Sequence, residues 1–164
     1  MDFTFQNTSI IVLTLLTGLS AGLSFTWANT ITTGIGNLDN YGYLSAFQQM
    51  NRTILNLPFF IVFFGPFVLG LVNLYSFKNA PSSLIGVLIS ATIIYFLGVV
   101  LVTIFGNVPL NEVLDKTDLI SASNEDLKAL RNIFEAKWNR LHLIRTVSSI
   151  GSFFLLILIL LVKK

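Results

Sequence analysis

The residues best suited to catalysis or to binding a polar group lie at the start of the last apolar run, in the stretch WNRLHLIRT. His142, the only histidine, is followed three residues later by Arg145 and preceded by Trp138, so the three share one helical face. An imidazole can take a proton, and a guanidinium can stabilise the oxyanion that forms. This pattern predicts base-assisted removal of a proton from an apolar aromatic molecule. Passive binding of an amphiphile would use the same groups.

Further polar side chains flank the other apolar runs near the same predicted end of the molecule. Arg52 and Asn56 precede the second run, Asn107 and Asn111 follow the third, and Asn29 ends the first. Amides are good hydrogen-bond partners for a buried polar site. Arg52 is an alternative to Arg145 for stabilising the oxyanion. The opposing interpretation is that the arginines reach lipid phosphates and the tryptophans anchor the membrane interface.

Several other chemistries are disfavoured by residue type. The chain has no cysteine and a single histidine, so a zinc site of the usual kind is not expected. No carboxylate pairs with His142 by local spacing, and there is no phosphate-binding loop or dinucleotide fingerprint. We therefore expect no cofactor, because haem bound by His142 would need a second axial histidine from another chain. With a net charge of +2 and no charge runs, no nucleic-acid partner is expected.

The composition indicates a single membrane domain over residues 1–164. Charged residues make up 11% of the chain and hydrophobic residues 54%, whereas a soluble domain has about 25% charged residues. Four runs are long enough to cross the hydrocarbon as helices, at residues 10–30, 57–77, 84–105 and 141–162. The first run is expected to be retained, because no basic residue precedes it as in a signal peptide.

These runs predict an all-α four-helix bundle with two long connections, residues 31–56 and 106–140, on one side of the membrane. The connections should contain interfacial helices, and Gln48, Arg52 and Asn56 recur every four residues on one face. Gly106 and Pro109 predict that one helix stops and another begins. The segment SNED resembles a capping box, and it begins an apolar stripe that predicts a helix over residues 124–162.

Small residues and basic residues carry weaker information on assembly and orientation. The spacings Gly18–Gly22 and Gly86–Ser90 predict close helix packing, within the bundle or in a homodimer. Lys78 and the terminal Lys163 and Lys164 favour cytoplasmic termini in a bacterial inner membrane, although Arg52 and Arg140 argue for the reverse. Membrane lipid and a hydrophobic aromatic small molecule are the expected partners.

Three blocks, QQMNRTILN, NVPLN and WNRLHLIRT, resemble the motifs of the anthrone-oxygenase-like family of small four-span membrane proteins. The resemblance implies a membrane four-helix bundle. Some members oxidise anthrones to anthraquinones with molecular oxygen, without a required metal or flavin. The last block varies, and some members have asparagine at the position of His142. Carried onto this chain, the motif positions are Asn51, Arg52, Asn56, Asn107, Pro109, Asn111, Trp138, His142, Arg145 and Thr146.

Two functions follow as hypotheses. The first is oxygenation of an apolar polycyclic phenol through a carbanion, with His142, Arg145 and Arg52 as catalytic residues. The second is a non-catalytic membrane protein that binds a lipid or quinone-like amphiphile, or that acts as a small partner subunit. In the first hypothesis the substrate is bound by Asn29, Asn51, Asn56, Asn107, Asn111 and Trp138.

Overall fold

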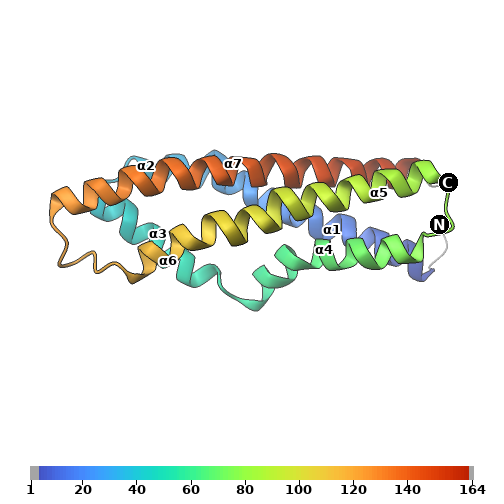
Figure 1. Cartoon of the computed structure of the whole chain (residues 1–164), viewed down its shortest axis with the longest axis horizontal. Helices are drawn as coiled ribbons and strands as arrows, with labels where there is room; N and C mark the ends of the chain where they lie inside the picture. The colour runs from blue at the N-terminus through green and yellow to red at the C-terminus, as the bar shows by residue number, and fades with distance from the viewer. Residues whose placement is uncertain (1–3, 163–164) are drawn as a thin grey trace.

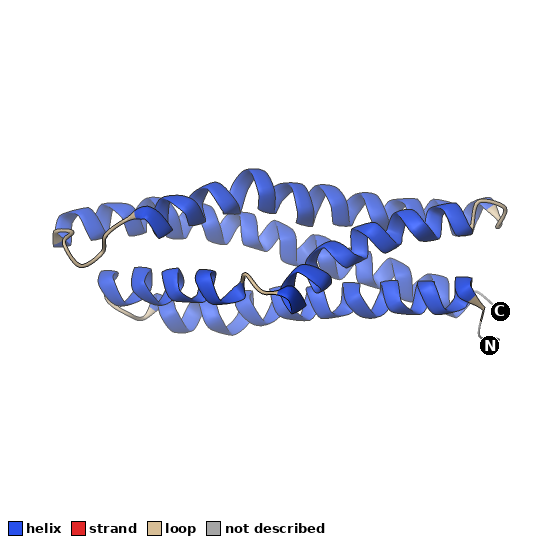
Figure 2. Ribbon diagram, turned by 90° about the horizontal axis from the view of Figure 1, so that it is seen from below, coloured by secondary structure: helices blue, strands red, loops and turns tan. Residues whose placement is uncertain are grey.

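Four helical segments form an elongated bundle in a computed structural model that describes residues 4–162 (Figure 1). Each segment is long and apolar enough to cross a membrane, namely Phe5–Gly36, Leu57–Ser76, Ser82–Lys116 and Asn124–Leu161. Within residues 4–162 no strand is present (Figure 2). The predicted all-α membrane bundle is therefore confirmed. Lys163 and Lys164, used above for orientation, lie outside the described residues.

The chain order places the two long connections together. The start of α1, the end of α7 and the turn between α4 and α5 lie at one end of the bundle, while α2, α3, α6 and the first turns of α7 lie at the other (Figure 1). The elements are α1 (Phe5–Thr26), the π-helical η1 (Trp27–Ile31), α2 (Thr32–Gly36), α3 (Asn40–Ile54), α4 (Leu57–Ser76), α5 (Ser82–Tyr95), the π-helical η2 (Phe96–Leu101) and η3 (Thr103–Asn107), α6 (Val108–Lys116) and α7 (Asn124–Val162).

The predicted stop at Gly106 is wrong, because the third segment is helical from Ser82 to Lys116. The turn before Pro109 is π-helical, and the N–H of Val108 bonds to the carbonyl of Thr103, five residues back. A π turn is wider than an α turn. The chain therefore passes Pro109, whose missing N–H and ring would interrupt a regular α-helix, without ending. The first segment likewise continues beyond its predicted end, through η1 to Gly36.

A hydrophobic core of its own holds the connections together at one end of the bundle. α3 and α6 pack against the first half of α7, and Phe134 and Trp138 meet Phe47 edge to face. The Gln48 side-chain amide donates to the carbonyl of Leu114 at 2.9 Å, which fastens α3 to α6. We call this unit the cap. Its buried members are Tyr43, Leu44, Phe47, Leu114, Leu119, Leu127, Phe134 and Trp138.

The predicted start of α7 is confirmed. The hydroxyl of Ser123 accepts from the N–H of Asp126 at 3.2 Å and donates to its carboxylate at 2.7 Å. α7 then runs for 39 residues, which at 1.5 Å per residue exceeds the thickness of the hydrocarbon. Its N-terminal half, which includes Trp138, therefore belongs to the cap and its C-terminal half to the membrane bundle, and His142 and Arg145 follow Trp138 near the boundary.

The small-residue prediction is confirmed at one position within the described chain. A Cβ at Gly18 would lie 2.7 Å from the ring of Phe153, so this glycine allows α1 to approach α7 closely. Cβ atoms at Gly22 and Gly86 would meet no heavy atom within 4 Å. Close packing of the Gly18–Gly22 pair is therefore limited to Gly18.

Candidate functional site

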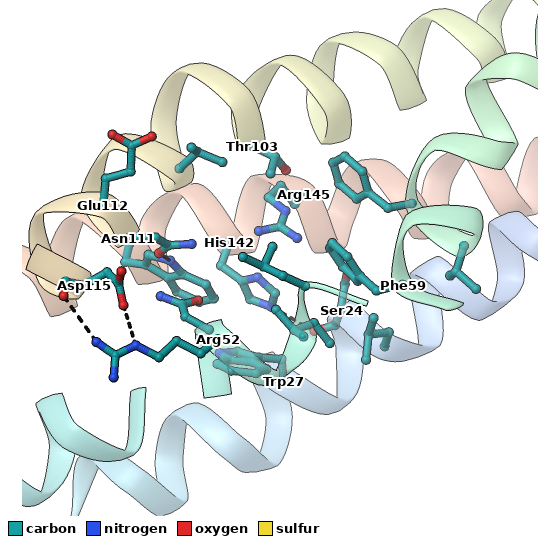
Figure 3. Close-up of a pocket in the computed structure, with 18 of the residues that line it drawn as sticks. Ser24, Trp27, Arg52, Phe59, Thr103, Asn111, Glu112, Asp115, His142 and Arg145 are labelled. Carbon is teal, nitrogen blue, oxygen red and sulfur yellow. Dashed lines mark hydrogen bonds and ion pairs between the residues drawn. The ribbon is translucent and has the colours of Figure 1, made fainter. Parts of the chain in front are cut away.

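A pocket of about 330 Å³ lies where the cap meets the membrane bundle. Its walls come from α1 and η1, from the corner between α3 and α4, from η3 and α6, and from α7 (Figure 3). The volume lies at the lower end of the range for small-molecule sites. Among the predicted site residues, those that line it are Asn51, Arg52, Asn111, Trp138, His142 and Arg145.

His142 is held in one orientation by its neighbours. Its Nε2 lies 3.0 Å from the carbonyl oxygen of Ser24, and because a carbonyl only accepts, the neutral ring carries its proton on Nε2. The imidazole stacks on Trp138 with 4.8 Å between ring centroids and 14° between planes. Nδ1 is buried and has no hydrogen-bond partner within the described chain. The ring thus keeps one unprotonated nitrogen, the kind of atom that a base needs, and the surrounding groups bury it.

Trp138 is fixed by two asparagines that differ in their relation to the pocket. Its indole N–H donates to Oδ1 of Asn111 at 2.8 Å. This bond orients the Asn111 amide, whose nitrogen stays available as a donor at the pocket wall. Asn107 is fully buried, and its amide donates to the backbone carbonyl of Trp138 at 3.4 Å. Asn107 therefore supports the pocket wall from behind, and the structure does not place it on the wall.

Arg145 brings a positive charge into the pocket. Its side chain points from α7 into the same space as His142, and Trp27 and Phe59 lie around them (Figure 3). Its Nε is buried without a hydrogen-bond partner, and no ion pair to Arg145 is present among residues 4–162.

Two further pocket-lining residues have a buried N–H donor without a hydrogen-bond partner, as Arg145 does. The side-chain nitrogens of Asn51 and Trp27 are buried and without a hydrogen bond in the described structure. Together with Nε of Arg145, three buried N–H groups of pocket-lining residues thus lack an acceptor in the described chain, and Nδ1 of His142 also lacks a partner. An unsatisfied buried donor costs about 1–3 kcal/mol, so an acceptor that reaches these groups gains binding free energy.

Arg52 differs from Arg145 in that its charge is already paired. Nε of Arg52 lies 2.6 Å from the carboxylate of Asp115, and both side chains are about half exposed. The guanidinium also donates to the backbone carbonyl of Asp115 at 3.3 Å. This pair joins α3 to α6 at the mouth of the pocket (Figure 3). Glu112 and Lys116, 3.5 Å apart, form a second exposed pair on the same rim.

Asn29 and Asn56 do not line the pocket. Asn29 is exposed on η1, and its amide donates to the neighbouring hydroxyl of Thr30. Asn56 is the N-cap of α4, where its Oδ1 accepts from the N–H of Phe59 and its Nδ2 donates to the carbonyl of Thr53. Asn56 lies beyond the end of α3, so it does not continue the face formed by Gln48 and Arg52.

Two partners in the site were not found by sequence reasoning. Asp115 pairs with Arg52 across 63 residues, and the Ser24 carbonyl meets His142 across 118 residues. Neither has a local signal, because one pairing depends on how two helices cross and the other uses a backbone atom. Within residues 4–162 no group of three or more histidine, aspartate or glutamate side chains could hold a metal ion.

Comparison with known proteins gives one match. The family described as anthrone oxygenase matches residues 59–155, which is more than half of the chain. This region contains the predicted site residues of the third and fourth segments, including Asn111, His142 and Arg145. No curated protein and no solved structure matches the chain.

Proposed function

The chain belongs to the anthrone oxygenase family, and from this premise we propose that it oxygenates an apolar polycyclic phenol dissolved in the membrane. His142 would remove a proton from the substrate, and Arg145 would stabilise the resulting oxyanion. Asn51 and Asn111 would bind further oxygen atoms of the ring system, and Trp138 would hold His142 in place. Arg52 is less suited to hold the oxyanion, because Asp115 already neutralises it.

The observation that carries this proposal is the set of unpaired polar atoms around one pocket. Nδ1 of His142, Nε of Arg145 and Nδ2 of Asn51 are all buried without a partner in the described chain. A base and two donors within one apolar pocket match a molecule that loses a proton from carbon and gathers negative charge on oxygen. Donors that are already in place need no reorganisation when this charge develops.

The chemistry balances with molecular oxygen as the only co-reactant. A methylene flanked by aromatic rings, para to a ring carbonyl, loses a proton to His142, and the electron pair spreads onto the carbonyl oxygen beside Arg145. The carbanion transfers electrons to oxygen and forms a carbon–oxygen bond, and the peroxide takes the proton back from His142. The hydroperoxide then loses water as the O–O bond and the second C–H bond break. The methylene carbon is oxidised to a ketone, and dioxygen is reduced to the ketone oxygen and water.

The proposed location is a bacterial inner membrane, with both termini in the cytoplasm. Four apolar helical segments support a membrane location. Lys78, in the turn between α4 and α5, lies at the same end of the bundle as the start of α1 and supports cytoplasmic termini under the positive-inside rule.

Turnover of emodin anthrone tests the proposal directly. Purified protein in lipid nanodiscs under oxygen should form emodin, measured by absorbance, together with one oxygen consumed per quinone. His142→Gln and Arg145→Gln should each lower kcat by about 100-fold or more, which is the usual cost of losing a general base or an oxyanion donor. Arg140→Gln is the matched control, since Arg140 is exposed on the same helix and does not line the pocket.

A second function remains supported by the apolar part of the pocket. Leu23, Phe59 and Phe63 form a wall suited to any flat amphiphile, whether or not it reacts. Saturable binding of emodin with no oxygen consumption from the anthrone would reject the oxygenase and leave a binding protein for quinone-like molecules.

A further inference from the structure

The exposed residues that line the pocket form two groups of opposite character, which are called here the two halves of its mouth. One half carries the charged pairs Arg52–Asp115 and Glu112–Lys116. The other half is formed by Leu55, at the corner between α3 and α4, and by Val108, at the start of α6. Both apolar side chains line the pocket and are also exposed on the outside of the molecule.

Leu55 owes its position to a tight turn. The N–H of Asn56 donates to the carbonyl of Ile54 at 2.8 Å, and Leu55 between them has φ −74° and ψ 67°. These are the features of an inverse γ-turn. The turn leaves the Leu55 side chain 65% exposed, although the same side chain lines the pocket. Leu55 therefore both lines the pocket and reaches the outside of the molecule.

The outer surface beside this half of the mouth is apolar on both flanks. On the α4 side, Leu57 is 71% exposed, and Phe60 follows one turn later. On the other side, Phe105 is 76% exposed and Ile104 precedes it, three and four residues before Val108. In water, large side chains exposed in this way would be unfavourable, but in a membrane they face lipid. Charged pairs are favourable in the headgroup layer, and exposed apolar side chains are favourable among the acyl chains.

We propose that the pocket is loaded sideways from the lipid leaflet, through the gap between Leu55 and Val108. The ligand is an aromatic amphiphile dissolved in the membrane, and Leu55 determines which ring systems pass. The Arg52–Asp115 pair closes the side that faces water. This route rests on the proposed function only in requiring an apolar ligand in the pocket, and it holds equally for an enzyme and for a binding protein.

The chain contains its own reporter for ligand entry. It has two tryptophans, Trp27 and Trp138, and both line the pocket. A quinone that enters will quench their fluorescence, so stopped-flow quenching measures the entry rate. The chain has no cysteine, so a single introduced cysteine can be blocked with a bulky methanethiosulfonate reagent and freed again with a reductant.

The experiment compares three blocked sites in lipid nanodiscs, with 1,8-dihydroxyanthraquinone as the probe. In Leu55→Cys the bulky reagent is attached at the proposed gap. In Asp115→Cys it is attached at the rim that faces water. Leu57→Cys is the matched control, because Leu57 is two residues away and exposed but does not line the pocket. Blocking Leu55→Cys should slow quenching by about tenfold or more, since a narrowed entrance acts on the association rate. Reduction should restore the rate, and the blocked Leu57→Cys variant should behave like the unmodified protein.

Each other outcome overturns the route. Equal quenching rates for the blocked Leu55 and Leu57 variants, or slowing only by the block at position 115, would show that the ligand does not pass Leu55. Absence of quenching in the unmodified protein would show that no quinone enters at all. Failure of the proposed chemistry is seen separately, as quenching that depends on Leu55 in a protein that does not oxidise emodin anthrone.

Discussion

Two regions of the molecule bury polar side chains among apolar helices, and they do so in different ways. The first region lies near the end of the bundle that holds the start of α1 and the α4–α5 turn. There the amide nitrogen of Asn73 donates to the hydroxyl of Ser9 at 2.8 Å and to the carbonyl of Leu69 at 2.8 Å. Of the Asn73 side chain only Oδ1 lacks a hydrogen-bond partner, whereas at the pocket the side-chain nitrogens of Arg145, Asn51 and Trp27 have no partner in the described chain. The difference teaches that buried polarity alone does not mark a site.

The two regions also differ in what surrounds the polar atoms. Asn73 is fully buried beside a core that includes Leu13, Phe77 and Leu88, so its hydrogen bonds can serve only helix association. Arg145 lines a pocket of about 330 Å³, so its N–H groups can reach a molecule that enters. The comparison therefore separates residues that join helices from residues that are held ready for a ligand, and four substitutions test that separation.

Arg145→Leu should show the largest effect and the clearest difference from the other region. Loss of the oxyanion donor should lower kcat for emodin anthrone by about 100-fold or more. Thermal stability should be unchanged or higher, because an unpaired charge inside an apolar bundle costs free energy to bury. Steady-state rates and thermal unfolding in the same detergent measure both. A large loss of stability together with the loss of activity would instead make Arg145 a structural residue.

Asn73→Leu should give the opposite pattern. Removing the amide leaves the Ser9 hydroxyl without its interhelical donor, and interhelical hydrogen bonds in membranes are worth about 0.6–1.7 kcal/mol. The free energy of unfolding should fall by that amount, with turnover unchanged. A double-mutant cycle with Ser9→Ala isolates the pair, and a coupling energy near zero would show that the bond does not hold α1 to α4.

Asn111→Leu should act on substrate binding more than on the chemical step. The Trp138 indole loses its acceptor at the pocket wall, and the substrate loses one amide donor. A hydrogen bond is worth about 1 kcal/mol, so KM should rise about fivefold while kcat changes little. The tryptophan emission should shift as well, because the indole N–H changes its environment. Unchanged KM with a shifted emission would mean that Asn111 only orients Trp138.

The four apolar segments and the helix over residues 124–162 could be predicted from the sequence, because hydropathy and the apolar stripe at Leu127, Leu130 and Phe134 are local signals. The polar positions on α7 could be predicted for the same reason, since Trp138, His142 and Arg145 share one face of one helix. The continuous helix through Gly106 and the packed core of the cap could not, because they depend on a π turn and on contacts between distant segments. The roles of Asn56 and Asn107 could not. A cap at the start of α4 and a bond to the Trp138 carbonyl depend on turns and helix crossings that no local pattern specifies.

Arg52→Gln should have the smallest effect, and it tests the point at which sequence and structure point to different arginines. In the sequence Arg52 and Arg145 are equivalent candidates for the oxyanion, but in the structure Arg52 is half exposed and bound to Asp115. An exposed ion pair contributes about 0–1 kcal/mol, so turnover should change by less than about fivefold and the free energy of unfolding by no more than that range. Asp115→Asn should have an effect of similar size, and high salt should reduce both differences. A fall in kcat for Arg52→Gln as large as that for Arg145→Leu would mean that the ion pair opens when substrate binds and that both guanidinium groups face the reacting oxygen.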